Sequence, residues 1–91
     1  MSDDPLEPLR ARFRERAGAD GLALANALAR GDAAEIERLA HGLAGAAGLF
    51  GYAEVGSMAL QIDERFARGA SFSVDRVQAL VVALEGLGDY S

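Results

Sequence analysis

The sequence predicts an all-α protein, an antiparallel up-down four-helix bundle with a short additional N-terminal helix. Three observations support this prediction. Ala and Leu, which favour helix, dominate the composition. No segment alternates polar and apolar residues for long, as a half-buried strand would. The breaks between expected helices are short, and short connections make successive helices pack antiparallel. With 91 residues, 51% of them hydrophobic, the chain fits one small domain, which we expect to span residues 1–91.

The additional N-terminal helix is expected over about residues 5–17. Pro5 is tolerated in a first helical turn, and the apolar residues after it are spaced for one helix face. The run Ala17-Gly18-Ala19 weakens this helix, so we expect it to end there. Asp20 is then a predicted N-cap, and the bundle core is expected over about residues 20–88.

Local signals also divide the bundle core into helices. Asp32, with Glu35 three residues later, resembles a capping box and begins the helix that carries the candidate site. Ser73 is a cap candidate for the last helix. The breaks between the bundle helices are expected at Gly31, Gly51 and Arg68-Gly69.

Charge and composition exclude several classes of function. The formal net charge is -5, from 14 acidic and 9 basic residues, and every basic residue is Arg. Nucleic acid and anionic membranes are therefore poor partners, because both require a basic surface. The chain has no Cys and one His, which excludes disulfides and metal sites built from Cys or His pairs. We expect no cofactor, and the absence of a signal peptide or an apolar membrane span predicts a cytoplasmic protein.

The only histidine, His41, is predicted on the solvent face of its helix. The apolar arc of that helix covers about 80°, and His41 lies roughly 160° from the centre of the arc. The arc consists of Ile36, Leu39, Leu43, Ala47 and Phe50. Five residues share the face of His41 and are called the docking face here: Ala34, Glu37, Ala44, Gly45 and Gly48. Most of them carry little or no side chain, so another protein could approach the imidazole.

Glycines inside this helix require an explanation, because each costs roughly 0.8–1 kcal/mol relative to Ala. Gly45 and Gly48 lie on the face of His41, where no core partner is expected, so a cleared docking surface explains them better than helix packing. Gly42 lies on the flank, and for it close helix packing remains an equal alternative.

The stretch from His41 to Gly51, HGLAGAAGLFG, resembles the signature of histidine-containing phosphotransfer (HPt) domains, H-x-L-K-G-[AS]-[AS]-x-x-[LF]-G. The resemblance extends over most of the chain. The same stretch is also similar to the phosphorylated N-terminal domain of chemotaxis histidine kinases. The resemblance implies an antiparallel four-helix bundle whose histidine, here His41, receives a phosphoryl group from a receiver aspartyl-phosphate or a kinase domain and passes it on.

Two further residues are candidates for the site. If the helices on either side of Gly51 pair antiparallel, position 41 lies level with about 61–63. The family often has a Gln or Glu that bonds the imidazole at the position of Asp63, which we expect to orient His41, with Gln61 as the alternative partner. Asp63 as an ordinary exposed acid also remains open. The family usually has Lys where this chain has Ala44; Arg38, one turn before His41, could supply the missing charge to the phosphate or be a solvated charge.

These residues predict a phosphocarrier that is not an enzyme and has no nucleotide site of its own, because no GxxxxGK[ST] loop is present. The expected partners are a response-regulator receiver domain, which would bring Mg²⁺, and a histidine kinase. We expect a monomer, and the ends of the sequence weakly favour a standalone protein. The alternatives are a degenerate module that binds a receiver or kinase without carrying phosphate, and a plain helical interaction protein.

Overall fold

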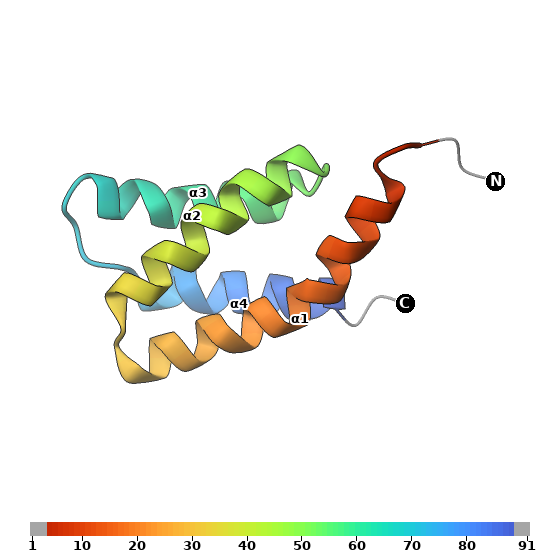
Figure 1. Ribbon diagram of the computed structural model, residues 1–91. Helices are drawn as coiled ribbons and strands as arrows, with labels where there is room; N and C mark the ends of the chain where they lie inside the picture. The colour runs from red at the N-terminus through yellow and green to blue at the C-terminus, as the bar shows by residue number, and fades with distance from the viewer. Residues whose placement is uncertain (1–3, 89–91) are drawn as a thin grey trace.

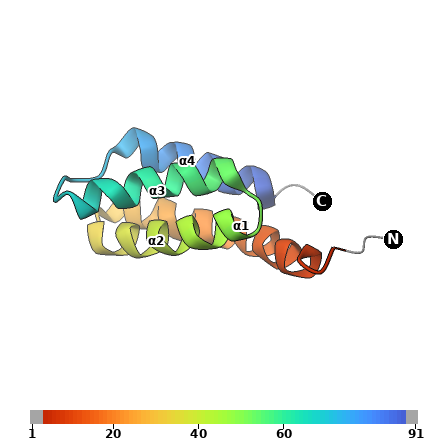
Figure 2. The same ribbon diagram turned by 90° about the horizontal axis from the view of Figure 1, so that it is seen from above.

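The computed structural model describes residues 4–88 and holds four α-helices and no strand within that range. The helices are α1 (Glu7–Arg30), α2 (Ala33–Leu49), α3 (Ala53–Ala67) and α4 (Val74–Gly88). α2 packs mainly on α3, and α1 packs mainly on α4 (Figure 1). Figure 2 shows the bundle from above, with the α3–α4 connection at the end opposite to the start of α1 and the end of α4. The prediction of an all-helical bundle is confirmed.

The predicted short N-terminal helix is wrong as a separate element. One helix, α1, runs through the expected break without interruption. Ala17 is fully buried, and Gly21 lies against the Cβ of Leu84, where an added methyl group would be 3.3 Å away. Packing on α4 therefore outweighs the roughly 1 kcal/mol that a glycine costs inside a helix. Asp20, predicted as an N-cap, lies in the interior of α1.

The turns around α2 follow the predicted breaks. Gly31 ends α1 with a φ of 65°, and Gly51 follows α2 with a φ of 89°, a left-handed conformation that favours glycine. The carboxylate of Asp32 accepts a hydrogen bond from the backbone N–H of Glu35 at 3.2 Å, so the predicted cap is present. The carboxylate of Glu35, however, accepts a hydrogen bond from the guanidinium of Arg38 rather than from a backbone N–H at the start of α2. Ser73, the other predicted cap, accepts from the backbone of Arg76 at 3.4 Å.

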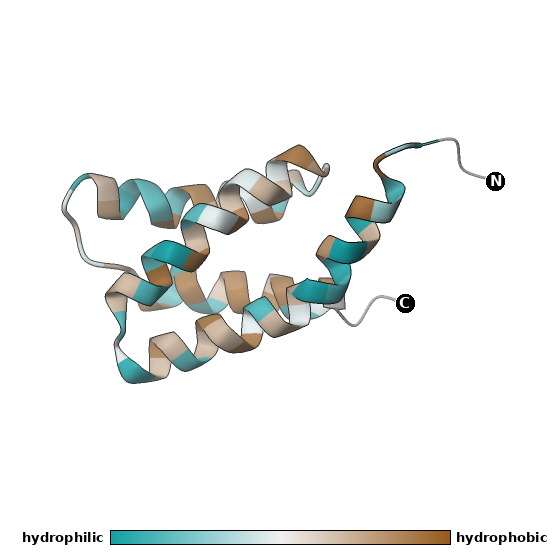
Figure 3. Ribbon diagram, in the orientation of Figure 1, coloured by the Kyte–Doolittle hydropathy of each residue, from teal (hydrophilic) through white to brown (hydrophobic). Residues whose placement is uncertain are grey.

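The core runs along the centre of the bundle and contains side chains from all four helices. Each helix carries both hydrophobic and hydrophilic residues (Figure 3), as expected for helices that bury one face. The largest fully buried side chains are Leu24, Ile36, Ile62, Leu80, Leu84 and Val77. Within residues 4–88, none of the helices has the combination of length and apolar character needed to span a bilayer.

The N-terminal half of α1 packs on the turn that joins α2 to α3. The ring of Phe13 stacks on Tyr52 with a centroid distance of 5.1 Å and lies 6.2 Å from Phe50. Arg14 donates a hydrogen bond to the hydroxyl of Tyr52 at 2.8 Å and forms an ion pair with Glu7 at 3.2 Å. The hydrogen bond to Tyr52, and after it the hydrogen bond to Glu7, raise the pKa of Arg14 above its ordinary value. α1 thus holds the end of the α2–α3 pair as well as packing on α4.

Candidate functional site

α2 presents His41 to solvent, as the wheel predicted. The side chain of His41 is 78% exposed. Ile36, Leu39, Leu43 and Ala47 of the predicted arc are buried, and Phe50 is half-buried. Ala40, which lies between the arc and His41 on the wheel, is fully buried as well. The buried side of α2 therefore extends farther toward the histidine than the predicted arc.

Asp63 of α3 lies beside the imidazole. Its Oδ2 is 3.2 Å from Nδ1 of His41 across a separation of 22 residues, a distance compatible with a hydrogen bond. In the tautomer with its hydrogen on Nδ1, the Nδ1–H group donates a hydrogen bond to this carboxylate. Nε2 then keeps a free lone pair. The side chain of Asp63 is 25% exposed, so the pair is open on the histidine side and partly covered on the carboxylate side. Gln61, the alternative partner, instead accepts a hydrogen bond from Arg76.

A glycine in α3 sets the distance between the two helices of the site. A Cβ built on Gly56 would lie 3.2 Å from the backbone nitrogen of Gly48 and 3.6 Å from the Cβ of Ala47. A Cβ here would be in unusually tight contact with the backbone of α2, so a glycine favours this close approach of α3 to α2. The approach lies at the start of α3, two turns of helix before Asp63. Gly56 therefore helps to bring α3 within hydrogen-bonding distance of His41.

The surface around the imidazole is a shallow depression of about 380 Å³. It is lined by Ala34, Glu37, Arg38, His41 and Asp63. Arg38 donates from Nε to Oε1 of Glu35 at 2.8 Å, and a second nitrogen of its guanidinium pairs with the same oxygen. This hydrogen bonding raises the pKa of Arg38 above its ordinary value, so the side chain remains a cation. Its charge is already paired, and the other ionised groups of the depression are acidic.

The docking face is open over most of its area. Ala34, Glu37, Gly45 and Gly48 are exposed, and a Cβ built on Gly45 or Gly48 meets no atom within 4 Å. Ala44 differs from the expectation, because it is half-buried and packs against the core. Gly42 is also free of neighbours within 4 Å, so the alternative that it permits close helix packing is wrong.

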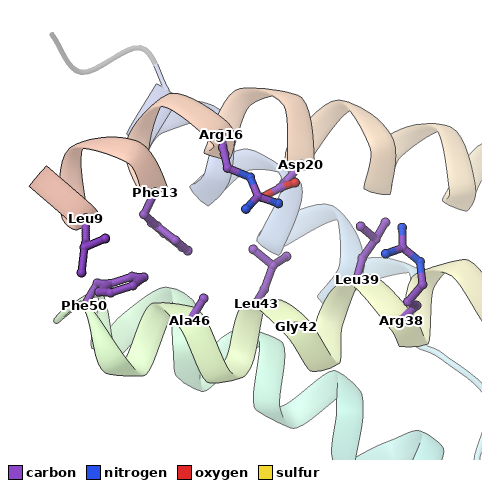
Figure 4. Close-up of a pocket in the computed structure, with 10 residues that line it drawn as sticks. All are labelled: Leu9, Phe13, Arg16, Asp20, Arg38, Leu39, Gly42, Leu43, Ala46 and Phe50. Atoms are coloured by element: carbon purple, nitrogen blue, oxygen red, sulfur yellow. The ribbon is translucent and has the colours of Figure 1, made fainter.

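A groove of about 430 Å³ runs between α1 and α2, next to the docking face. Figure 4 shows Leu9 and Phe13 of α1 facing Phe50 and Ala46 of α2, with Arg16, Asp20 and Arg38 farther along. Gly42 lines the groove, and a side chain there would project into this space. The missing side chain of Gly42 therefore keeps the groove open.

Three contributions to the site were not predicted from the sequence. The burial of Ala40 depends on the helices that pack against α2, and the wheel of a single helix does not contain them. The contact of Tyr52 with Arg14 joins residues 38 positions apart. Gly56 gave a usable signal, because a glycine inside an apolar helical pattern indicates a close approach of another backbone.

The fold and the site together define a helical module that presents a single histidine from one face. The profile of the Hpt domain family matches residues 8–89, nearly the whole chain, and the chain belongs to this family. Hpt domains are phosphocarrier modules that take part in histidine phosphotransfer and interact with kinases and receivers of two-component systems. No curated protein and no solved structure shows a significant match to the chain.

Proposed function

We propose that the protein carries a phosphoryl group on His41 between receiver-domain aspartates, or from a histidine kinase to a receiver. The observation that supports this most directly is the exposed imidazole whose Nδ1 lies 3.2 Å from Asp63 Oδ2. In the transfer, Nε2 attacks the phosphorus of an aspartyl-phosphate in line. The N–P bond forms as the P–O bond breaks, and the aspartate of the receiver leaves as a carboxylate.

The partner would supply most of the charge stabilisation. Glu37 and Asp63 make the depression around His41 acidic, and Arg38 is paired with Glu35. A phosphoryl group carries negative charge that must be neutralised during transfer. We therefore infer that Mg²⁺ and further cations belong to the receiver, while this chain contributes the nucleophile, its orientation and the docking face.

We infer an antiparallel up-down bundle that acts as one unit over residues 1–91, as a cytoplasmic monomer without a nucleotide site of its own. Phosphotransfer profiling against purified phosphorylated receivers tests the function. The expected result is transfer of label to the chain as acid-labile, base-stable phosphate, because phosphohistidine has that stability.

The second candidate is a module that binds a receiver or kinase without carrying phosphate. Ala44, in place of the Lys usual in the family, and the pairing of Arg38 with Glu35 favour it, since both leave the site without a free cation. Saturable binding of a receiver without any acid-labile label on His41 would establish this candidate. Formation of phosphohistidine would exclude it.

Substitution of Asp63 tests the orientation of the imidazole. Asp63→Ala should slow transfer about tenfold. It removes one hydrogen bond to the imidazole, and a loss of about 1.4 kcal/mol in transition-state stabilisation corresponds to that factor. Asp63→Asn keeps an acceptor oxygen and should recover part of the rate. The ¹⁵N shifts of the ring should show Nδ1–H in the wild type and a mixture of tautomers in Asp63→Ala. Equal rates for Asp63→Ala and the exposed neighbour variant Glu64→Ala would show that Asp63 does not orient His41.

Substitution of Gly48 tests the docking face. Gly48→Arg should leave the helix intact and even add up to about 1 kcal/mol of stability, because Arg is a better helix former than Gly. Transfer should nevertheless slow about tenfold or more, since a loss of 1.4 kcal/mol in docking corresponds to that factor. Gly18→Arg is the matched control, because Gly18 of α1 also has no atom within 4 Å of a built Cβ. Unchanged transfer by Gly48→Arg would place the receiver elsewhere on the surface.

A further inference from the structure

Three of the nine arginines line one pocket beside the connection from α3 to α4. Figure 1 shows this connection at one end of the bundle. Arg65 comes from the last turn of α3, Arg68 is the residue that directly follows α3, and Arg76 comes from the first turn of α4. Together they are called the arginine cluster here. They line a pocket of about 290 Å³ with Gln61 and Glu64. With three guanidinium groups and one carboxylate, this pocket is positive in a chain whose net charge is -5.

Hydrogen bonds orient two members of the arginine cluster, and none of the three forms an ion pair among the described residues. Arg65 donates from Nε to the backbone oxygen of Ser71 at 3.1 Å, and Arg76 donates to the side-chain oxygen of Gln61. Both acceptors are uncharged. Among the described residues, four arginines form ion pairs with carboxylates, whereas none of the cluster does. The arginines with ion pairs are Arg10, Arg14, Arg30 and Arg38.

Helix electrostatics explain only part of the cluster. Arg65 and Arg68 lie at the C-terminal end of α3, where the helix dipole favours a cation. Arg76 is the third residue of α4, where the dipole favours an anion and disfavours a guanidinium. The position of Arg76 near the other two arginines is therefore electrostatically unfavourable, and the stability of α4 does not compensate for it. A bound anion would compensate for it.

We propose that the arginine cluster binds an oxyanion, phosphate or carboxylate. Guanidinium groups bind both anions through paired N–H donors, and two of the three are already held in place by Ser71 and Gln61. The site is separate from the docking face. On the α3 wheel, Gln61 and Arg65 lie about 160° from Asp63. The proposal therefore does not depend on phosphate transfer through His41.

Titration of the full chain by NMR tests the proposal. The Nε–Hε signals of the ¹⁵N-labelled protein are followed in low-salt buffer as inorganic phosphate or a short polyglutamate peptide is added. We expect saturable shifts of the arginine cluster with a dissociation constant of about 1–10 mM, and weaker binding when NaCl is added. Tighter binding of the peptide would assign the site to an acidic segment of a protein, and binding of phosphate alone would assign it to a free anion.

Two variants provide the control. Arg68→Gln should weaken binding about fivefold, since one charge-assisted contact is lost. Arg12→Gln removes an exposed arginine of α1 that has no ion pair among the described residues, and should leave binding unchanged. Circular dichroism verifies that both variants are folded. Shifts that do not saturate, or an equal loss of binding in Arg12→Gln, would overturn the proposal.

Discussion

On the proposed function, His41→Gln should leave the chain folded and prevent it from accepting a phosphoryl group. The side chain of His41 is 78% exposed, so its replacement should change the free energy of unfolding by no more than about 0.5 kcal/mol. Gln is also at least as good a helix former as His. The chain has no other histidine and no cysteine, so no second nitrogen or sulfur nucleophile of that kind can replace it.

The measurement is transfer of labelled phosphate from a phosphorylated receiver, with urea unfolding carried out on the same preparation. The amide of Gln can still donate to Asp63, which keeps the local structure close to that of the wild type. Acid-labile, base-stable label on His41→Gln would show that the phosphoacceptor had been wrongly assigned. A large loss of stability would instead show that His41 supports the fold.

Gly56→Leu should destabilise the bundle strongly and separate His41 from Asp63. Even a Cβ at this position lies 3.2 Å from the backbone nitrogen of Gly48, and backbone cannot move aside as a flexible side chain can. Overpacking of this kind costs about 1–3 kcal/mol or more, which is a large part of the stability of a small domain. The better helix propensity of Leu offsets up to about 1 kcal/mol of this cost.

Chemical unfolding and the ring ¹⁵N shifts of His41 would measure the two effects separately. Gly18→Leu is the matched control, because it makes the same exchange inside a helix where nothing lies within 4 Å of a built Cβ. That variant should be as stable as the wild type or more so. If Gly56→Leu matched Gly18→Leu in stability, the close approach of α3 to α2 would not be set by Gly56.

The fold class was predictable because each bundle helix repeats its apolar residues at helical spacing and ends at a glycine or a capping residue. The single error in the division of the chain arose at Ala17-Gly18-Ala19. Local propensity favours a break there, but the burial of Ala17 and the close packing of Gly21 on α4 favour continuity. This packing joins the first helix to the last. The sequence around Ala17-Gly18-Ala19 does not reveal it.

The site was predictable as far as single-helix geometry reaches. The wheel placed His41 on the open side of α2. The spacing across Gly51 placed positions 61–63 level with His41, and the family resemblance favoured Asp63 over Gln61. The wheel gave the wrong exposure for Ala44, because the half-buried state of this residue depends on its neighbours outside α2. The arginine cluster was also missed, since Arg76 reaches Gln61 only when α4 packs beside α3.

The difference between the two helix pairs has a consequence for the order in which the chain folds. α2 and α3 are joined by three residues, so His41 and Asp63 meet through a short loop with a low entropic cost of closure. α1 and α4 lie at opposite ends of the sequence, and their pairing closes nearly the whole chain. Because local contacts form faster than distant ones, the hairpin that carries the histidine can assemble early, and the joining of the first helix to the last completes the domain.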